Sequence, residues 1–195
     1  MQYKTHLVTS FTVGFPMLVA TGNLNVPNLL AYGVGVLLPD IDHPTSFMGQ
    51  KNKALSKTIS KTLGHRGGTH SLFCAAIVYA LCLWIRNLYF TKAVYVAPFW
   101  LLLGYLAHLL EDSFSKEGIN WFWPLSKNKF KAGGHFAYYR TGKISEYILL
   151  GFFTCILLGE IYLWYLGRLT FTQGFGKIFA LFCRKMITFL CPYAY

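Results

Sequence analysis

The apolar residues of this chain fall in long runs that short polar stretches separate. Residues 71–90, 94–110 and 146–166 predict helices that cross a bilayer, which takes about 20 residues in an α-helix. Residues 7–20 and 28–38 predict two shorter apolar helices, inserted at a tilt or in part, that together form a helical hairpin. The pattern therefore predicts an all-α fold, a multi-pass membrane helical bundle.

The order of these helices predicts which polar residues meet. The runs 71–90 and 94–110 are joined by a short turn, so the two helices are antiparallel and the start of one lies beside the end of the other. His70 is thereby brought to the same membrane face as His108 and Asp112. By the same reasoning, His6 and Asp40 share a face if the first two helices form a hairpin.

The C-terminal residues follow a different pattern. Residues 175–190 are apolar but contain Lys177, Arg184 and Lys185, which predicts a helix along the membrane interface or an additional transmembrane helix. We therefore expect a membrane-bound domain at residues 1–166 and a C-terminal apolar and basic segment at residues 167–195.

Composition also favours a membrane protein. Hydrophobic residues make up 54% of the 195 residues and charged residues only 13%, which is too apolar for an ordinary soluble domain. The net charge of +11 fits loops that face anionic lipid, whereas nucleic acid is not expected, because the basic residues flank apolar runs. Five cysteines without a CxxC pair predict neither a disulfide framework nor a thiolate zinc site, and no removable signal peptide is evident.

The basic residues also predict an orientation. Most of them fall on the face that carries the polar motifs, including the lysines at positions 51, 53, 57 and 61. The positive-inside rule then places these motifs at the cytoplasmic surface of the membrane.

The first polar motif is Leu-Leu-Pro-Asp-Ile-Asp-His-Pro at residues 37–44. Pro39 ends the second helix, because a proline disfavours helical geometry in the residue before it. Asp40 and Asp42 then fall in a turn, where two carboxylates can converge on Zn²⁺, Mn²⁺ or Mg²⁺. The alternative is that Asp is an ordinary turn residue beside proline. His43 is a weaker candidate, for which packing within the turn is the alternative.

The second motif is Gly-His-Arg-Gly-Gly-Thr-His-Ser at residues 64–71. Its glycines let the backbone approach a ligand closely, and free N–H groups at the start of a helix favour an anion such as phosphate. Arg66 is a candidate for a bidentate phosphate contact, or else an anchor at the interface. His65 and His70 are candidate metal ligands, and Thr69 or Ser71 is available to cap the helix.

The third motif is His108 with Asp112, four residues apart on one helical face. This spacing lets an imidazole and a carboxylate bind one metal ion or two adjacent ones. By itself it is more typical of a hydrogen-bonded pair near a helix end, and Glu111 is a rival ligand on the neighbouring face. The convergence of all three motifs at one membrane face indicates a functional site.

These motifs, together with Thr5-His6, Gly142 and Glu146, resemble the LexA-regulated, inner-membrane-associated, metal-dependent hydrolases of bacteria, the YdjM type. The resemblance covers about residues 5–146. It implies a protein of the bacterial inner membrane and of the DNA-damage (SOS) response. It also implies hydrolase activity.

More remotely, the order of the His and Asp residues is similar to that of the zinc-dependent phospholipase C and nuclease P1 group. That likeness implies a ligand set, or its core, made of five residues: His6, Asp40, His70, His108 and Asp112. Asp40 or Asp42 would orient or deprotonate a metal-activated water, and His135 and Glu146 would complete the shell of a second ion. With the motif residues included, the candidate metal ligands are His6, Asp40, Asp42, His65, His70, His108 and Asp112, and the candidate catalytic residues are Asp40, Asp42 and Arg66. Zinc is favoured, as one to three ions, with Mn²⁺ or Mg²⁺ as alternatives.

Together these observations favour a membrane-bound metal-dependent hydrolase that cleaves a phosphoester, with a membrane phospholipid as a candidate substrate, at the cytoplasmic membrane face. The alternative is a non-catalytic metal-binding or transport-related inner-membrane protein. Transport would need acids in the middle of a span, and Glu160 is the one such residue. A weaker third interpretation makes the basic loops a docking surface for nucleic acid or a cytoplasmic protein. The sequence does not predict the oligomeric state.

Overall fold

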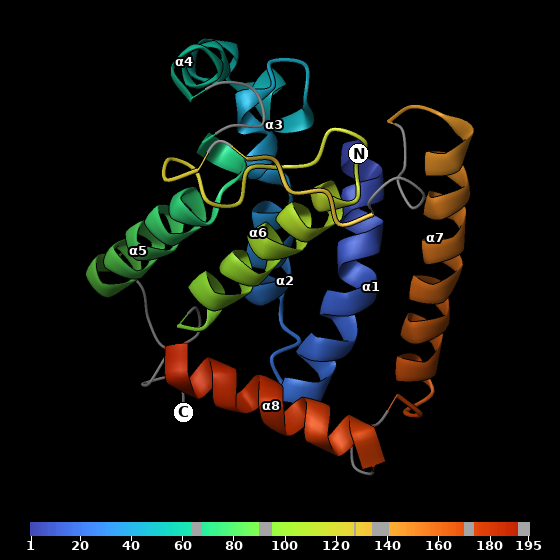
Figure 1. Ribbon diagram of the computed structural model, residues 1–195. Coiled ribbons are helices and arrows are strands. Elements are labelled where there is room, and N and C mark those ends of the chain that lie inside the picture. The colour runs from blue at the N-terminus through green and yellow to red at the C-terminus, as the bar shows by residue number, and fades with distance from the viewer. Residues whose placement is uncertain (64–67, 90–94, 127, 134–140, 170–173, 191–195) are drawn as a thin grey trace.

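The computed structural model describes residues 1–63, 68–89, 95–126, 128–133, 141–169 and 174–190, which are mainly helical (Figure 1). The helices are α1 (Tyr3–Thr21), α2 (Val26–Leu37), η1 (Pro39–Asp42), α3 (Phe47–Lys51), α4 (Lys53–Leu63), η2 (Gly68–His70), α5 (Leu72–Tyr89), α6 (Ala97–Ser113), α7 (Ile144–Tyr165) and α8 (Gly174–Leu190). Outside them, an isolated antiparallel bridge pairs Ile119 with Phe130. The predicted all-α class is confirmed, and each apolar run forms a helix within a few residues of its expected bounds.

The first two helices form the predicted hairpin (Figure 1). Gly22 ends α1 at a φ of 72°, a left-handed conformation that glycine adopts without strain, and its N–H donates to carbonyl groups of the last helical turn. The side chain of Asn25 then caps α2 by accepting a hydrogen bond from the backbone N–H of Asn28. These two caps return the chain antiparallel to α1, which brings the end of α2 back to the level of the N-terminus.

Helices α2 and α6 pack backbone against backbone at the centre of the molecule. A Cβ on Gly35 would lie 2.1 Å from the carbonyl oxygen of Leu101, and one on Gly104 would lie 2.2 Å from that of Tyr32. Only glycine fits at such an approach. Around this contact, Leu18, Val36 and Trp100 are completely buried. The close packing fixes the end of α2, and with it η1, against the last turns of α6.

The segment after α6 folds back over the start of α5. The backbone N–H of Leu72 donates to the carbonyl oxygen of Trp121 over 3.0 Å, and the indole N–H of Trp121 donates to the hydroxyl of Ser113. Ser71 is the residue that caps α5, since its hydroxyl accepts from the N–H of Cys74. The antiparallel pair α5 and α6 therefore has its polar ends, η2 and Ser113, at the same side of the bundle.

One helix in the described part of the chain, α7, is long and apolar enough to cross a membrane. It packs against α1 through a face of half-buried residues, and Glu146 is its only fully buried residue. Apolar side chains, including Tyr147, Ile148, Phe152, Leu158 and Tyr162, are exposed on its other face. Helices α2 and α5 also expose apolar faces, made of Val26, Leu30 and Val34 on α2 and Phe73, Ile77, Leu81, Trp84 and Leu88 on α5. The multi-pass arrangement stays a prediction, and these faces are the surfaces it would place in lipid.

Helix α8 lies across the far end of α1, at the opposite end of the bundle from η1 and η2 (Figure 1). Its residues Ala180, Cys183 and Ile187 are buried at helical spacing, whereas Phe182 and Phe189 are exposed. One face of α8 thus packs on the bundle and the other is free to contact lipid. Its assignment as an interfacial or an additional transmembrane helix stays a prediction.

Candidate metal centre

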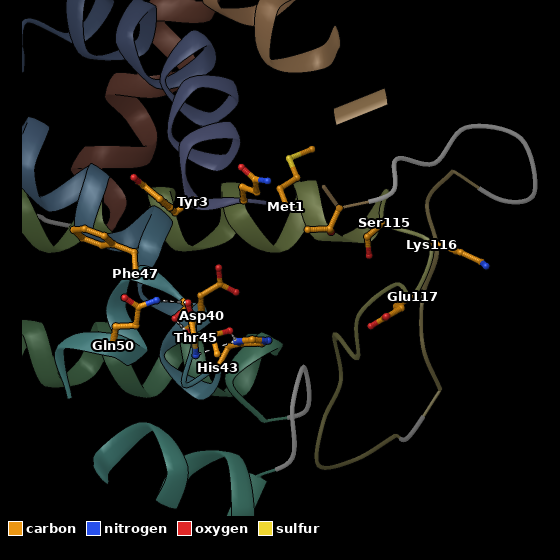
Figure 2. A pocket seen from close by; sticks show the side chains of 13 residues that line it. Met1, Tyr3, Asp40, His43, Thr45, Phe47, Gln50, Ser115, Lys116 and Glu117 are labelled. Carbon is orange, nitrogen blue, oxygen red and sulfur yellow. Dashed lines mark hydrogen bonds between the residues drawn. The ribbon is translucent and has the colours of Figure 1, made fainter. Parts of the chain in front are cut away.

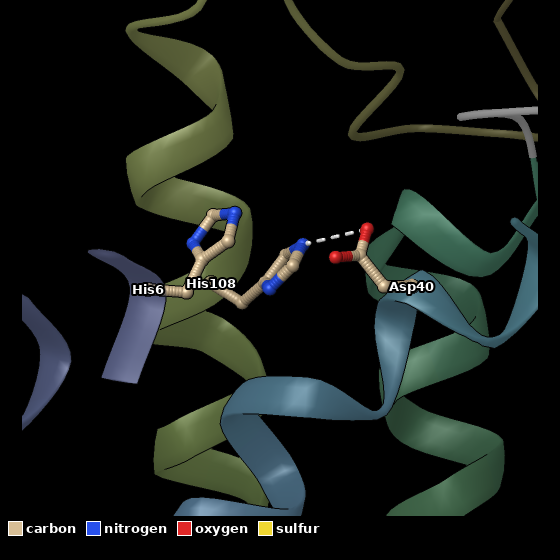
Figure 3. Close-up of side chains that lie close together, drawn as sticks. All are labelled: His6, Asp40 and His108. Atoms are coloured by element: carbon tan, nitrogen blue, oxygen red, sulfur yellow. Dashed lines mark ion pairs between the residues drawn. The ribbon is translucent and has the colours of Figure 1, made fainter. Parts of the chain in front are cut away.

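Five of the expected ligands come together at one end of the bundle, from four different elements. His6 lies in the second turn of α1, Asp40 in η1 and His70 at the end of η2, while α6 supplies His108 and Asp112. Figure 3 shows His6, His108 and Asp40 converging from three of these elements. The three imidazoles and Asp112 are completely or almost completely buried, and 19% of the Asp40 side chain is exposed.

The distances within this cluster are short and similar. Nε2 of His70 lies 3.3 Å from Nε2 of His108, 3.7 Å from Oδ1 of Asp40 and 3.6 Å from Oδ2 of Asp112. Nε2 of His108 lies 3.7 Å from the same oxygen of Asp40 and 3.9 Å from the same oxygen of Asp112. Nε2 of His6 lies 3.5 Å from Oδ1 of Asp112. Nε2 of His70 and Nε2 of His108 therefore each lie within 4 Å of a carboxylate oxygen of both Asp40 and Asp112.

Each imidazole is oriented by a partner at Nδ1. Nδ1 of His6 lies 2.5 Å from Oε2 of Glu111, and Nδ1 of His108 lies 2.7 Å from the carbonyl oxygen of Val36. Nδ1 of His70 lies 3.1 Å from Oγ1 of Thr69 and 3.6 Å from Oδ2 of Asp42. In all three cases Nε2 is the nitrogen that faces the cluster. A carboxylate or carbonyl behind a histidine in this way is the usual support for a metal-binding imidazole.

Glu111 occupies a supporting position behind His6. Besides His6, its carboxylate accepts hydrogen bonds of 2.7 Å from the hydroxyls of Thr9 and Ser10 on α1. Glu111 and Asp112 are neighbours on α6, yet one contacts the back of His6 and the other faces its Nε2. Glu111, the rival ligand in the sequence, thus fastens α1 to α6.

Asp42 also lies behind the cluster. Its Oδ2 accepts a 2.8 Å hydrogen bond from the hydroxyl of Thr69 and lies near Nδ1 of His70. The hydroxyl of Tyr105 donates to the carbonyl oxygen of Thr69, which ties η2 to α6. Asp40 and Asp42 therefore point to different sides of η1: Asp40 faces the Nε2 atoms, and Asp42 is buried behind His70.

The charges in the cluster perturb each other. Burial alone would raise the pKa of Asp40, but the neighbouring imidazoles of His108 and His70 outweigh it and lower that pKa below its ordinary value. Burial alone would lower the pKa of His70, but contacts with Asp40 and Asp42 and the charge of Asp112 raise it to about 9. The carboxylates therefore favour a positive charge at this point.

The donor set fits a divalent cation. Imidazole nitrogens and carboxylate oxygens bind zinc at about 2.0–2.2 Å, so two ligands of one ion are separated by roughly 3–4 Å, and the distances here span 3.3 to 3.9 Å. The ligand atoms form two groups, one from His6, Asp40 and His108 and one from His70, His108 and Asp112, and within each group all of them lie within 4.8 Å of one another. Nε2 of His6 is buried and makes no hydrogen bond to any described residue. Because His108 belongs to both groups, they could hold one ion or two adjacent ones.

A cavity of about 760 Å³ opens beside the cluster (Figure 2). Asp40 is the cluster residue that lines it. The other walls come from the N-terminus, from α3 with the turn before it, from the segment after α6 and from the residues just before α7: Met1, Gln2, Tyr3, His43, Thr45, Ser46, Phe47, Gln50, Ser115, Lys116, Glu117 and Thr141. A ligand in this cavity would reach the cluster through Asp40.

The remaining candidates lie elsewhere. His65, Arg66 and His135 fall outside the described residues. His43 lines the cavity, and its Nδ1 lies 2.8 Å from the hydroxyl of Thr45. Glu146 is buried at the start of α7, where it accepts hydrogen bonds from the backbone N–H groups of Gln2 and Gly142. Its carboxylate holds α7 to the beginning of α1.

The supporting contacts are what sequence reasoning missed. The Thr-His pair at residues 69 and 70 and the adjacent acids at 111 and 112 were visible as patterns. Which member of each pair faces the cluster depends on how α1, η1 and α6 pack, and no spacing along the chain specifies that packing.

The fold and site together define a helical protein with a buried cluster of three histidines and carboxylates and, among the described residues, one membrane-span candidate. Comparison with known proteins gives the family: the chain belongs to the YdjM inner membrane protein family, whose model matches residues 1–183. It is therefore a bacterial inner-membrane protein, as the resemblance predicted. No solved structure matches the chain.

Three relatives illustrate the range of similarity. Inner membrane protein YdjM of Escherichia coli is 43% identical over 89 residues, which cover 45% of this chain and 44% of the relative. The chain therefore spans less than half of that relative's length. Uncharacterized protein YvsG of Bacillus subtilis is 30% identical over 178 residues, which cover 87% of this chain and 99% of the relative. Inner membrane protein YbcI of E. coli is 33% identical over 109 residues, 54% of this chain and 59% of the relative.

Proposed function

We propose that this protein is a membrane-bound metal-dependent hydrolase that cleaves a phosphoester at the cytoplasmic face of the inner membrane. The observation that carries the proposal is the convergence of the Nε2 atoms of His70 and His108 with Oδ1 of Asp40 and Oδ2 of Asp112. Burying such a group of titratable side chains costs folding free energy, because charged side chains are poorly solvated away from water. Its presence therefore favours a functional role.

The residues divide into those that would hold the ion and those that would position them. Asp40, His70, His108 and Asp112 would hold it, with His6 beside Asp112. Zinc fits this set best, and Mn²⁺ or Mg²⁺ would use fewer imidazoles. A bound dication supplies a Lewis acid and brings the pKa of water to about 7. Glu111, Thr69 and Asp42 keep the imidazole rings in the orientation that such binding requires.

Asp40 is the residue we assign to proton transfer. It combines contact with the cluster and contact with the cavity, and its lowered pKa keeps it ionised at neutral pH. An ionised carboxylate at this position can orient a water molecule toward a substrate in the cavity, and it would accept the proton of that water once a bound dication had lowered the pKa of the water. Arg66 would bind the phosphate group of the substrate, a role that its place in the second motif suggests.

Two observations support a lipid-borne substrate. The cavity is lined partly by the aromatic side chains of Tyr3 and Phe47, whose rings stack at a centroid distance of 5.1 Å, and partly by polar groups. Its lining residue Thr141 also lies three residues before the apolar helix α7 begins at Ile144. A molecule with a phosphate group and apolar chains suits such a position. Expression under LexA control, within the DNA-damage response, is part of the same proposal.

The second candidate is a non-catalytic metal-binding or transport-related membrane protein. The observation in its favour is Glu160, whose Oε2 is buried within α7 and makes no hydrogen bond to any described residue. An acid in the middle of a span is typical of an ion pathway. The two candidates differ in turnover: the hydrolase requires ester cleavage that depends on Asp40, and the transport protein does not.

The experiment is elemental analysis of the purified wild type beside His70→Ala and Asp112→Ala, paired with a screen of phosphodiesters and a lipid extract. We expect stoichiometric metal and hydrolysis in the wild type, and little of either in His70→Ala and Asp112→Ala. His43→Ala is the matched control, because it removes an imidazole beside the cavity that does not face the cluster. An equal metal content in all four proteins would contradict the assignment of the metal site. Bound metal without hydrolysis of any ester would favour the non-catalytic candidate.

A further inference from the structure

Helix α4 is a basic, amphipathic helix on the surface of the protein. Lys53, Lys57 and Lys61 recur every fourth residue and are exposed, and no acid occurs anywhere between residues 43 and 110. Leu55, on the other side of the helix, is 45% exposed. A helix with lysines on one side and an exposed apolar residue on the other is typical of binding at a lipid headgroup layer.

This helix is firmly attached to the cluster-bearing part of the chain. Helices α3 and α4 both contact η1, and Ser56 of α4 is completely buried. A Cβ on Gly49 of α3 would lie 2.0 Å from the carbonyl oxygen of His43 and 2.9 Å from Oγ of Ser56. Gly49 thus allows α3, α4 and the end of η1 to pack as one unit. Because this contact faces the body of the protein, the lysines of α4 point away from it.

The position of α4 relative to α7 suits a membrane surface. In Figure 1, α4 is seen nearly along its axis at the end of the molecule that carries η1, while α7 extends within the plane of the view. If α7 crosses the bilayer, α4 therefore runs along the membrane surface, at the level of the lipid headgroups. Phe47 of α3 is 40% exposed there, and Nζ of Lys51 lies 4.8 Å from the centre of its ring.

We propose that α4 binds the anionic headgroups of the inner membrane through Lys53, Lys57 and Lys61, with Leu55 inserted among the acyl chains. The negative surface of a bacterial membrane complements a helix that carries only positive charge. Nucleic acid would also complement that charge, but it offers no apolar environment for the exposed side chains of Leu55 and Phe47. This binding does not depend on metal or on catalysis, so it goes beyond the proposed function. It would hold η1, and therefore Asp40, at the lipid surface.

The test compares two triple variants of the full chain in a neutral detergent. Lys53→Gln, Lys57→Gln and Lys61→Gln remove the lysine charges of α4, while Lys129→Gln, Lys131→Gln and Lys143→Gln remove the same charge from exposed positions elsewhere. Short-chain phosphatidylglycerol is titrated into each protein, with phosphatidylcholine as the neutral lipid, and the thermal midpoint gives an apparent Kd. Each lysine near an anionic surface contributes about a factor of five, so the α4 variant should bind phosphatidylglycerol roughly a hundredfold more weakly. The control variant should stay within a few-fold of the wild type.

Two further measurements separate this result from misfolding and from a general charge effect. Circular dichroism should give the same helix content for all three proteins, and Leu55→Ser should weaken binding several-fold without any change in charge. The proposal is overturned if both triple variants lose affinity for phosphatidylglycerol to the same extent, or if the wild type does not prefer phosphatidylglycerol to phosphatidylcholine. It is also overturned if Leu55→Ser binds phosphatidylglycerol as tightly as the wild type does. Displacement of the lipid by a single-stranded oligonucleotide at lower concentration would also overturn it, in favour of nucleic acid.

Discussion

Oε2 of Glu111 lies 2.5 Å from Nδ1 of His6, and this contact turns the other ring nitrogen toward Asp112. The two residues come from helices that are far apart in the sequence, so the contact both joins α1 to α6 and orients a candidate ligand. A carboxylate at this position also raises the basicity of the imidazole. The consequence is a role for Glu111 in metal affinity without direct contact to the ion.

We therefore predict that Glu111→Gln weakens metal binding about tenfold to a hundredfold, the usual effect of losing such a partner. Glutamine keeps the shape of the side chain and can still accept from Thr9 and Ser10, so the fold should be preserved. Competition with a chromogenic chelator measures the affinity. Glu117→Gln is the control, because it removes the same charge at an exposed position. An affinity unchanged in Glu111→Gln would mean that His6 is not a ligand.

The glycine contact between α2 and α6 leads to a second prediction. Gly104→Ala would place a methyl group against the carbonyl oxygen of Tyr32 and force the helices apart. Overpacking of this kind costs about 1–3 kcal/mol, and it would also lengthen the 2.7 Å contact between His108 and Val36. We expect a lower thermal midpoint and reduced metal content. Gly159→Ala on α7, where a Cβ meets nothing within 4 Å, should change neither.

A third prediction concerns pH. Metal binding needs a neutral Nε2 on His70, whose pKa is raised to about 9 in the metal-free protein. At pH 7 the ion therefore displaces a proton, and the apparent affinity should rise roughly tenfold for each pH unit up to about 9 and then level off. The stability of the metal-free protein changes with pH in the opposite direction to the metal affinity. The stabilising contribution of the protonated His70 is complete below about pH 6.5 and is lost as the pH rises through 9.

Calorimetry in two buffers of different ionisation enthalpy measures the protons released. At pH 7 we expect about one proton from His70 for each ion bound, and His70→Ala should release fewer. Metal binding that is independent of pH between 6 and 9 would contradict the assignment of His70 as a ligand.

The orientation gives a fourth prediction. A reporter inserted at Asn52, between α3 and α4, should be active as a cytoplasmic fusion, because lysines surround it on the face that carries the cluster. A reporter placed after Gly167, at the other end of α7, should be periplasmic if α7 crosses the membrane. Reporters with the same location at both positions would show that α7 does not span, and a periplasmic signal at Asn52 would reverse the orientation.

The helices could be predicted from the sequence because each is a continuous apolar run, and their order was enough to bring His70 to His108 and Asp112. Helices α3 and α4 were missed because they are short and polar, and they are held by Gly49 and Ser56 against η1. The different roles of Asp40 and Asp42 could not be predicted either. Two residues apart in a 3₁₀ helix, they point to different sides, about 120° apart, and only the packing of η2 and α6 decides which side is the cluster.

The exposure of Asp40 has a consequence for the rate at which an ion could enter or leave. His6, His70, His108 and Asp112 are at most 1% exposed, and 19% of the Asp40 side chain reaches the cavity. Exchange with free ions in solution would therefore proceed through that one carboxylate, and it should be slow. Loading would be easiest while α1 and η1 are still docking onto α6, so the identity of the ion would be decided by the supply at the moment of folding.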